Sequence, residues 1–584
     1  MTKKYIWATE DIYPSIESWE KEYSSVLSET DFSRYKNTLN TEEGFLSCMK
    51  AIEKIERKIE KLSVYATMLH DTDTTDSVYD GLVSKITALA VDFSSQVSFI
   101  TPELTALSEK KLNSYINSPA LKEYDYTLKC IKNEKEHVLS ENEEKLLAES
   151  GNALSSFREI FTKIDNADLP LKKIKHEGKS IPLSHGVYSV LLHGTDRKLR
   201  EKAYKSYYRT YLSLINVISA TYSGSVKKDV FLSKVKKYES SLSCALKKED
   251  VPEIVYHNLI SSVHQALPVL HEYINEKKKA LKLDKMYMYD MYAPITENPG
   301  LSLDYEKAYE LVKEGLSPLG KEYAELLCKA HDERWIDVYE KKGKRSGAYS
   351  ISVFDTHPFV LLNYQPTTHD VFTIAHELGH AMHSYFSSKN QPYAKADYRI
   401  FVAEVASTVN EVLLIYHLLE KEQDKGLKKY LLTYLLEMIR TTLFRQTQFA
   451  EFEAYSHGEI EKGNPLTKDG MCKKYAEINK EYYGNAIESD DYIKYEWARI
   501  PHFYRAFYVY KYATGIISAL AIVNRIKTEG QKAVDDYFAF LSSGGSNGPV
   551  ELLKIAGVDL TTKKPFEQAL KVFEDTLKKY ESID

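Results

Sequence analysis

Apolar residues recur at spacings of three and four along most of this chain, with charged residues between them. This period is typical of α-helices that bury one face. It is clearest in residues 41–69 and 78–107, and prolines fall mainly in the connections. We therefore predict that the chain up to about residue 165 is almost entirely helical, with long helices packed side by side.

The pattern changes between about residues 165 and 195, where prolines and a glycine interrupt short apolar runs. Such residues favour a short strand pair or an irregular connection. Helical periodicity then resumes over residues 203–281. We place a boundary here, between an N-terminal helical region of residues 1–195 and a second domain of residues 196–584, in which the candidate chemistry lies.

Strand-like segments precede the helix predicted at residues 368–388. Three short segments at 335–339, 347–353 and 359–364 are rich in β-branched and aromatic residues, which predicts short strands. Residues 368–388 return to the helical period, and Thr367 supplies a hydroxyl cap with an acid three residues later. The chain therefore predicts a mainly α fold with a small β-sheet next to this helix.

One edge of that sheet is a candidate peptide-binding strand. Gly347, Ala348 and Tyr349 begin its middle segment, and small residues let a second backbone approach closely. An exposed edge can hold an extended peptide through main-chain hydrogen bonds, with little dependence on the peptide's sequence. The alternative interpretation is a plain structural hairpin.

Charge and cysteine content narrow the partners and the compartment. Asp and Glu outnumber Lys and Arg by 84 to 78, so nothing favours a nucleic acid partner. The first ten residues lack the apolar core of a signal peptide, and the longest mainly apolar run, 515–523, is too short to cross a bilayer. Five widely spaced cysteines without a C-x-x-C pair suit reduced thiols. We expect a cytoplasmic protein with no membrane partner, and the sequence assigns no oligomeric state.

The run His376-Glu377-Leu378-Gly379-His380 carries the strongest chemical signal. Residues four apart lie on one face of a helix, so His376 and His380 can both bind one Zn²⁺ ion. Glu377 would lie beside that ion without binding it, in the position of a general base. This is the H-E-x-x-H arrangement of zinc metallopeptidases.

A catalytic zinc ion needs a third protein ligand and one open position for water. Glu404 is the first candidate, because it opens a second apolar helix that can lie against the first. His383 is the runner-up, but it lies seven residues from His376, about 10 Å along the helix axis. Glu411, seven residues after Glu404, could orient a ligand histidine or lie on the surface.

These residues resemble the thimet oligopeptidase type of zinc metallopeptidase, and most closely its bacterial oligoendopeptidase F branch. The resemblance covers about residues 195–565 and rests on residues 347–349, 363–364, 376–383, 404–407, 501–515, 544–549 and 556–559. It implies a two-lobed, mainly helical shell around a deep channel, with zinc at its floor and short peptides cleaved inside.

Residues 501–515 are a source of donors for the oxyanion that forms when water attacks a peptide carbonyl. A tyrosine hydroxyl can donate to an oxyanion without carrying a charge beforehand. We rank His502 and Tyr508 first, as catalytic residues. Tyr510 comes next, as a substrate-binding residue, and Tyr512 is a further candidate.

We predict a zinc-dependent endopeptidase that hydrolyses internal peptide bonds of short oligopeptides. A scaffold with structural zinc is one alternative, but structural sites usually fill four positions with Cys and His, and no cysteine lies near the motif. A zinc carboxypeptidase is the other. It would need a cationic group for the substrate's C-terminus, such as Arg499 or Arg505.

Overall fold

The computed structural model describes residues 3–297, 300–488 and 490–583. The chain forms two compact units, each assembled from three separate segments. Unit 1 comprises Met1–Val138, Gly300–Lys421 and Ala519–Asp559, and unit 2 comprises Leu139–Pro299, Glu422–Ser518 and Leu560–Asp584. The domain boundary at residue 195 is inferred from a change in the residue pattern and stays a prediction. The two units are defined instead by which residues contact one another in space.

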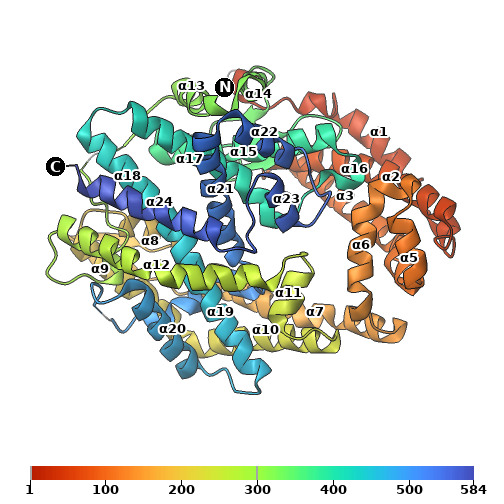
Figure 1. The fold of residues 1–584 in the computed structure, drawn as a ribbon. Coiled ribbons are helices and arrows are strands. Elements are labelled where there is room, and N and C mark those ends of the chain that lie inside the picture. The colour runs from red at the N-terminus through yellow and green to blue at the C-terminus, as the bar shows by residue number, and fades with distance from the viewer. Residues whose placement is uncertain (1–2, 298–299, 489, 584) are drawn as a thin grey trace. The chain divides into compact units, whose positions relative to one another are not determined.

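Helices make up most of both units, which confirms the predicted mainly α fold (Figure 1). Unit 1 contains α1 (Ile16–Leu27), α2 (Glu42–Thr72), α3 (Ser77–Gln96), α4 (Ile100–Ala106), α5 (Glu109–Ile116), α6 (Asp125–Glu134), α13 (Tyr305–Gly315), α14 (Lys321–Asp332), α15 (Thr368–Asn390), α16 (Tyr393–Ala396), α17 (Ile400–Lys421), α22 (Gln531–Leu541) and α23 (Pro549–Ile555). Unit 2 contains α7 (Glu141–Lys163), α8 (His185–Leu192), α9 (Arg197–Ser213), α10 (Ile215–Val235), α11 (Ser241–Lys247), α12 (Glu253–Ala280), α18 (Lys425–Ile439), α19 (Arg445–Glu461), α20 (Lys468–Tyr483) and α24 (Lys564–Glu581). Helix α21 (Tyr510–Glu529) contributes to both units.

The small sheet predicted from the alternation before residue 366 is present in unit 1. Its strands are β3 (Ile336–Asp337), β4 (Tyr349–Ile351) and β5 (Phe359–Leu361). The order is β3-β5-β4, with β3 parallel and β4 antiparallel to β5, and Val360 is in register with both Ile336 and Ser350. Phe359 and Leu361 are buried in a hydrophobic core shared with α1, α2 and α3. Because β5 pairs with both other strands it is the central strand, and β4 is an edge strand.

Of the two alternatives predicted between residues 165 and 195, a strand pair or an irregular connection, the structure contains the strand pair. Strands β1 (Lys173–His176) and β2 (Lys179–Pro182) form an antiparallel hairpin in unit 2. Gly178 supplies the positive φ, +78°, that its tight turn requires.

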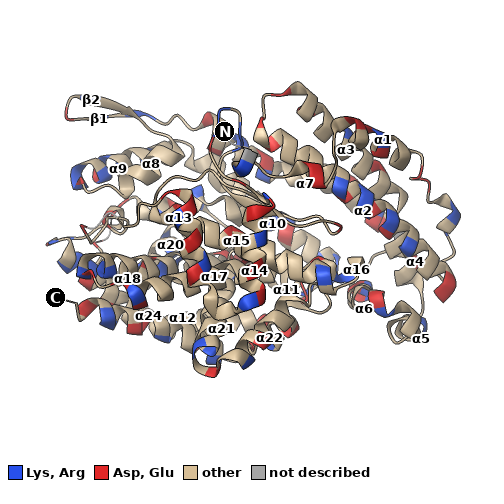
Figure 2. Cartoon of the chain, turned by 90° about the horizontal axis from the view of Figure 1, so that it is seen from above, with Lys and Arg blue, Asp and Glu red and all other residues tan. Residues whose placement is uncertain are grey.

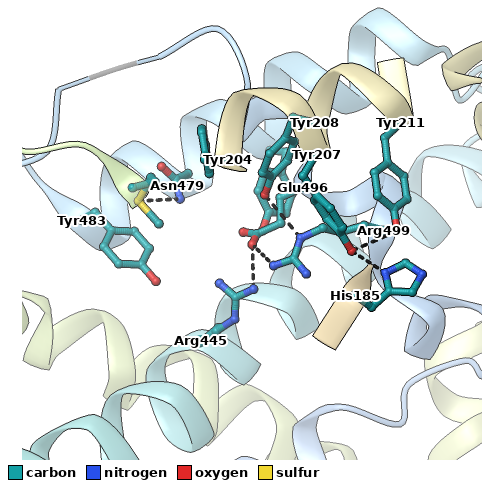
Figure 3. A network of polar contacts seen from close by, with 12 residues as sticks. His185, Tyr204, Tyr207, Tyr208, Tyr211, Arg445, Asn479, Tyr483, Glu496 and Arg499 are labelled. Carbon is teal, nitrogen blue, oxygen red and sulfur yellow. Dashed lines mark hydrogen bonds and ion pairs between the residues drawn. The ribbon is translucent and has the colours of Figure 1, made fainter. Parts of the chain in front are cut away.

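The interior of unit 2 contains an extended polar network (Figure 3). Glu496 in the 3-10 helix η10 (Ile493–Arg499) lies 2.6 Å from Arg445 and 2.9 Å from Arg499. Tyr475 donates its hydroxyl to the second oxygen of Glu496 at 2.6 Å, and Arg499 Nε donates to the Tyr208 hydroxyl at 3.3 Å. Buried charges are costly unless they are paired. The network therefore fixes α9, α19, α20 and η10 relative to one another.

Charged residues of both signs are intermixed along the visible helices instead of gathering in blocks of one sign (Figure 2). Within the described part of the chain, α17 is long and apolar enough to cross a membrane by length and composition. However, 67% of its most apolar window is buried inside the structure. Packing against neighbouring helices accounts for that composition.

Candidate active site

Helix α15 presents the two histidines of the H-E-x-x-H run on one face. The Thr367 hydroxyl caps the helix by accepting a hydrogen bond from the Asp370 N–H at 3.2 Å, as the sequence predicts. Val371, Ile374 and Leu378 are buried, at 1% exposure or less. The buried apolar stripe therefore fixes how α15 is rotated about its own axis.

Helix α17 packs directly along α15 in unit 1 (Figure 1). Gly379 permits this approach, because a Cβ there would lie 2.5 Å from Ser407 Cα and 2.7 Å from the Ala406 carbonyl oxygen. Asn410 adds a second tie by donating its side-chain amide to the Ala375 carbonyl at 3.0 Å. These two contacts determine which turn of α17 faces the histidines.

The turn that faces them carries Glu404. Its Oε2 lies 3.4 Å from His376 Nε2 and 3.7 Å from His380 Nε2, and the two ring nitrogens are 3.2 Å apart. Donors bound to one tetrahedral zinc ion at about 2.0–2.1 Å would lie roughly 3.4 Å from one another. The three side chains therefore fit a zinc ion in both chemistry and spacing.

Glu411, on the same helix, orients one of the histidines. Its carboxylate accepts a hydrogen bond from His376 Nδ1, so that Nε2 is left to face Glu404. Burial by itself would lower the pKa of His376, but Glu411 and Glu404 raise it well above its ordinary value. The carboxylates around the ring thus favour a cation at this position.

Glu377 has the environment of a general base. It is 7% exposed, and its Oε2 is buried without a hydrogen-bond partner among the described residues. Burial raises the pKa of Glu377 to about 7, although His376 opposes the shift. A carboxyl group that changes its protonation near neutrality suits proton transfer to and from water.

His383, the runner-up third ligand, lies apart from this group. Its ring is 1% exposed and stacks on Tyr398, with ring centroids 3.8 Å apart and planes 9° from parallel. Phe540 lies against it at 5.2 Å between centroids. The structure brings Glu404, and not His383, to the two histidines, because aromatic packing holds His383 in the core.

Of the predicted peptide-binding residues, Tyr349 begins the edge strand β4, and Gly347 and Ala348 directly precede it. Gly347 has a φ of +86°, and its carbonyl accepts a hydrogen bond from the Asn363 side chain at 2.7 Å. Tyr349 is half-buried and donates its hydroxyl to Asp71 at 2.8 Å, and Ala348 lies between the two. Within the part of the chain that the structure describes, this strand pairs with β5 on one side and with no strand on the other.

A cavity of about 700 Å³ lies in unit 1 directly beyond β4. Ser352 and Phe354 line it from the connection between β4 and β5, and Ser384 and Ser388 line it from α15, one and two turns after His380. The cavity also has acidic walls, contributed by Glu53, Glu56, Glu60 and Asp397. Sequence reasoning missed these acids, although spacings of three and four along α2 do place the first three on one helix face.

The predicted oxyanion donors form a cluster of rings in unit 2. His502 and Tyr508 stack with centroids 6.0 Å apart and planes 12° from parallel. The Tyr512 hydroxyl lies 3.3 Å from His502 Nε2, and its ring meets Tyr508 edge-on at 5.5 Å. The Arg505 guanidinium covers the Tyr508 ring at 4.1 Å. His502 is exposed and Tyr508 is half-buried.

Two other predicted residues are occupied by packing or pairing. Tyr510 is 1% exposed and lies edge-on to Tyr256, with centroids 5.4 Å apart, so its packing does not favour the predicted contact with substrate. Arg499 is held by Glu496 and Tyr208 in the buried network (Figure 3). Its charge is therefore already neutralised within the protein.

The fold and site together define a metallopeptidase: a mainly helical chain in which the H-E-x-x-H helix α15 meets a glutamate from α17. The chain belongs to peptidase family M3, whose family profile matches residues 190–572, and the Oligopeptidase F profile matches residues 103–170. The resemblance inferred from the motifs is thereby confirmed.

The similarity to known proteins extends over nearly the whole chain. Oligopeptidase PepF of Bacillus subtilis is 41% identical over 99% of this chain and 87% of its own length. Group B oligopeptidase PepB of Streptococcus agalactiae is 38% identical over 100% of this chain and 97% of its own. The crystal structure of oligoendopeptidase-F from Enterococcus faecium is 34% identical and superposes with a TM-score of 0.74, covering 97% of this chain and 98% of that one.

Proposed function

We propose that this chain is a zinc-dependent endopeptidase that hydrolyses internal peptide bonds of short oligopeptides. The observation that carries the proposal is the group of His376, His380 and Glu404, whose ligand atoms lie 3.2–3.7 Å apart. Imidazole nitrogens suit zinc better than magnesium or calcium, which prefer oxygen ligands. The similarity to proteins named oligopeptidases supports short peptides as the substrates.

Each of these residues has a definite part in the proposed hydrolysis. A zinc ion held by the three side chains supplies a Lewis acid, which lowers the pKa of water toward neutrality. Glu377 takes the proton from the attacking water and delivers it to the leaving amine. His502 and Tyr508 donate hydrogen bonds to the oxyanion, and loss of one such donor typically costs about 2.7–4 kcal/mol.

In this proposal, the main chain at the edge of the small sheet binds the substrate peptide. A peptide that pairs with Gly347, Ala348 and Tyr349 makes main-chain hydrogen bonds, which every peptide offers regardless of its side chains. The cavity beyond β4 adjoins the helix that carries the two histidines. It can accept side chains of a peptide extended along this edge.

The alternative activities have less support. A zinc carboxypeptidase needs an available cation for the substrate's terminal carboxylate. Of the two candidates, Arg499 is paired with Glu496, and the Arg505 guanidinium lies over the Tyr508 ring. A scaffold with structural zinc has no use for a buried carboxyl group such as Glu377 beside the ion. All five cysteines lie in the described part of the chain and none is joined in a disulfide, which fits the proposed cytoplasmic location.

Replacement of Glu377 by glutamine tests the proposed chemistry. The amide keeps the size of the side chain but cannot accept the proton, so we expect Glu377→Gln to bind zinc normally and lose at least about 100-fold in kcat. The assay uses a fluorogenic peptide blocked at both ends, with products identified by mass spectrometry. Internal cuts support an endopeptidase, whereas trimming of single residues from unblocked peptides, or full turnover by the variant, would contradict the proposal.

A further inference from the structure

Glu453 is a fully buried carboxyl group that the proposed mechanism does not use. It lies on α19 in unit 2 and is 0% exposed. Its Oε1 accepts a hydrogen bond from the backbone N–H of Phe507 at 2.6 Å, and its Oε2 has no hydrogen-bond partner among the described residues. A buried carboxyl group is costly, so a single strong bond to one backbone position calls for an explanation.

That backbone position is conformationally strained. Phe507 has a φ of +50°, in the left-handed region that residues with a β-carbon seldom adopt. Such a conformation costs on the order of 1–3 kcal/mol and persists only where the surroundings enforce it. The carboxyl of Glu453 meets this need, because it bonds the N–H of the strained residue itself.

The ring of Phe507 is anchored to the same helix. It lies against His457, one turn after Glu453, with centroids 4.6 Å apart, and edge-on to Tyr256 at 5.9 Å. His457 is itself fixed, because its Nδ1 donates to the Glu453 carbonyl at 2.9 Å. Helix α19 thus holds both the backbone and the side chain of Phe507.

The strained residue directly precedes Tyr508. Phe507 lies in a turn of the backbone, and Tyr508, which follows it, stacks against His502 with ring planes 12° from parallel. Tyr512 then reaches His502 Nε2 at 3.3 Å from the first turn of α21. A different φ at Phe507 would turn Tyr508 away from His502, since one backbone torsion redirects everything that follows it.

We propose that Glu453 is a positioning residue for the peptidase reaction: its buried carboxyl holds Phe507 in the left-handed conformation and so sets the orientation of Tyr508. The inference rests on the proposed function, in which Tyr508 donates to the oxyanion. Glu453 touches neither substrate nor metal and acts through the backbone of Phe507.

Two substitutions at Glu453 separate positioning from packing. Glu453→Met keeps the length of the side chain but removes the acceptor, so the Phe507 N–H is left unpaired. Glu453→Gln keeps an acceptor oxygen. Burial raises the pKa of Glu453 to about 8, so the neutral acid is already present near neutrality, and the neutral amide is a close substitute. Steady-state kcat and KM on an internally quenched peptide are the measurements.

We expect Glu453→Met to lower kcat at least about 10-fold while KM changes less than about 3-fold, because oxyanion donors act mainly in the transition state. Glu453→Gln should restore kcat to within about 3-fold of the parent. The proposal is overturned if kcat of Glu453→Met stays within about 2-fold of the parent, or if the glutamine variant loses as much as the methionine variant. Should Glu453→Met melt below the assay temperature, Glu453→Asp serves instead, since its shorter carboxyl falls short of Phe507.

A double-mutant cycle with Tyr508→Phe tests whether Glu453 acts through that tyrosine. If it does, the double variant loses no more than the worse single variant, whereas independent roles give losses that multiply and contradict the proposal. Asp290→Asn is a control for destabilisation alone, because Asp290 is also 0% exposed in unit 2 but pairs with Arg197 and Arg200. It should lower the melting temperature and leave kcat unchanged.

The same series separates the failure of this inference from the failure of the proposed function. Full turnover by Glu377→Gln would overturn the endopeptidase mechanism itself. Full turnover by Tyr508→Phe, with Glu377→Gln inactive, would leave the zinc chemistry standing and overturn the positioning role of Glu453.

Discussion

The choice of the third zinc ligand depends on a single side chain. Glu404 Oε2 lies within 3.7 Å of both ligand nitrogens, whereas the His383 ring is stacked on Tyr398. We therefore expect Glu404→Ala to weaken zinc binding by more than about 100-fold, beyond the 10–100-fold typical of losing a partner outside the ligand set. Zinc titration of the demetallated variant, followed by metal analysis, measures the change.

The matched control for this prediction is His383→Phe. Phenylalanine keeps the stacked ring but has no ligand atom, so zinc content and turnover should match those of the parent. Full zinc occupancy in Glu404→Ala, together with loss of zinc in His383→Phe, would show that the ligand assignment is wrong.

For single residues, the sequence predicts a role in the site where the spacing along a helix is enough to define the geometry. The spacing of four fixes His376 and His380, and an acid in an apolar helix marks Glu404. The part played by Glu411 stays open in the sequence, because an ionised side chain suits both a surface and a histidine partner. Only its contact with His376 Nδ1 decides between the two.

The pairing of α15 with α17 positions the site at the scale of helices. A methyl group at Gly379 would lie within 2.7 Å of the α17 backbone, which cannot move aside as a flexible side chain can. We expect Gly379→Ala to separate the helices, destabilise the protein by about 1–3 kcal/mol and weaken zinc binding, because Glu404 moves away from the histidines. Thermal melting and zinc titration test both effects.

Gly81→Ala is the control, since Gly81 lies in α3 of the same unit and a Cβ there meets nothing within 4 Å. Alanine should stabilise that helix by about 0.5–1 kcal/mol without affecting zinc. If the two alanine variants behave alike, close helix packing is not what places Glu404.

Local signals predict elements well, and non-local pairings poorly. The cap at Thr367 and the period of three and four predict a helix at 368–388, and α15 spans Thr368–Asn390. The parallel pairing of β3 with β5 has no local signature, because the paired residues Ile336 and Val360 are separated along the sequence by another strand, β4. The placement of His383 is hidden for the same reason, since its partner Tyr398 lies in the connection between α16 and α17.

At the scale of the whole molecule, the division into two units is what the sequence reveals least. Each unit joins segments separated by more than a hundred residues, as when Met1–Val138 packs with Gly300–Lys421. Composition and periodicity describe neighbours along the chain, so they carry no record of such contacts. The texture change near residue 195 marks a strand pair, and its use as a domain boundary remains a prediction.

Removal of the metal should abolish activity without unfolding the chain. Contacts between α15 and α17 at Gly379 and Asn410 hold the site together without the ion. We expect a chelator to stop turnover, leave the far-UV circular dichroism unchanged and lower the melting temperature by a few degrees, since a bound ligand stabilises the folded state. Added zinc should restore activity, whereas loss of helical signal on chelation would mean that the metal is needed for folding.

Zinc K-edge X-ray absorption on the purified protein tests the metal centre most directly. The expected spectrum is that of one four-coordinate zinc ion with nitrogen and oxygen ligands at about 2.0–2.2 Å, of which two are imidazoles and one position exchanges with solvent. A sulfur ligand near 2.3 Å, a site closed by four protein ligands, or no bound zinc at all would contradict the proposed peptidase.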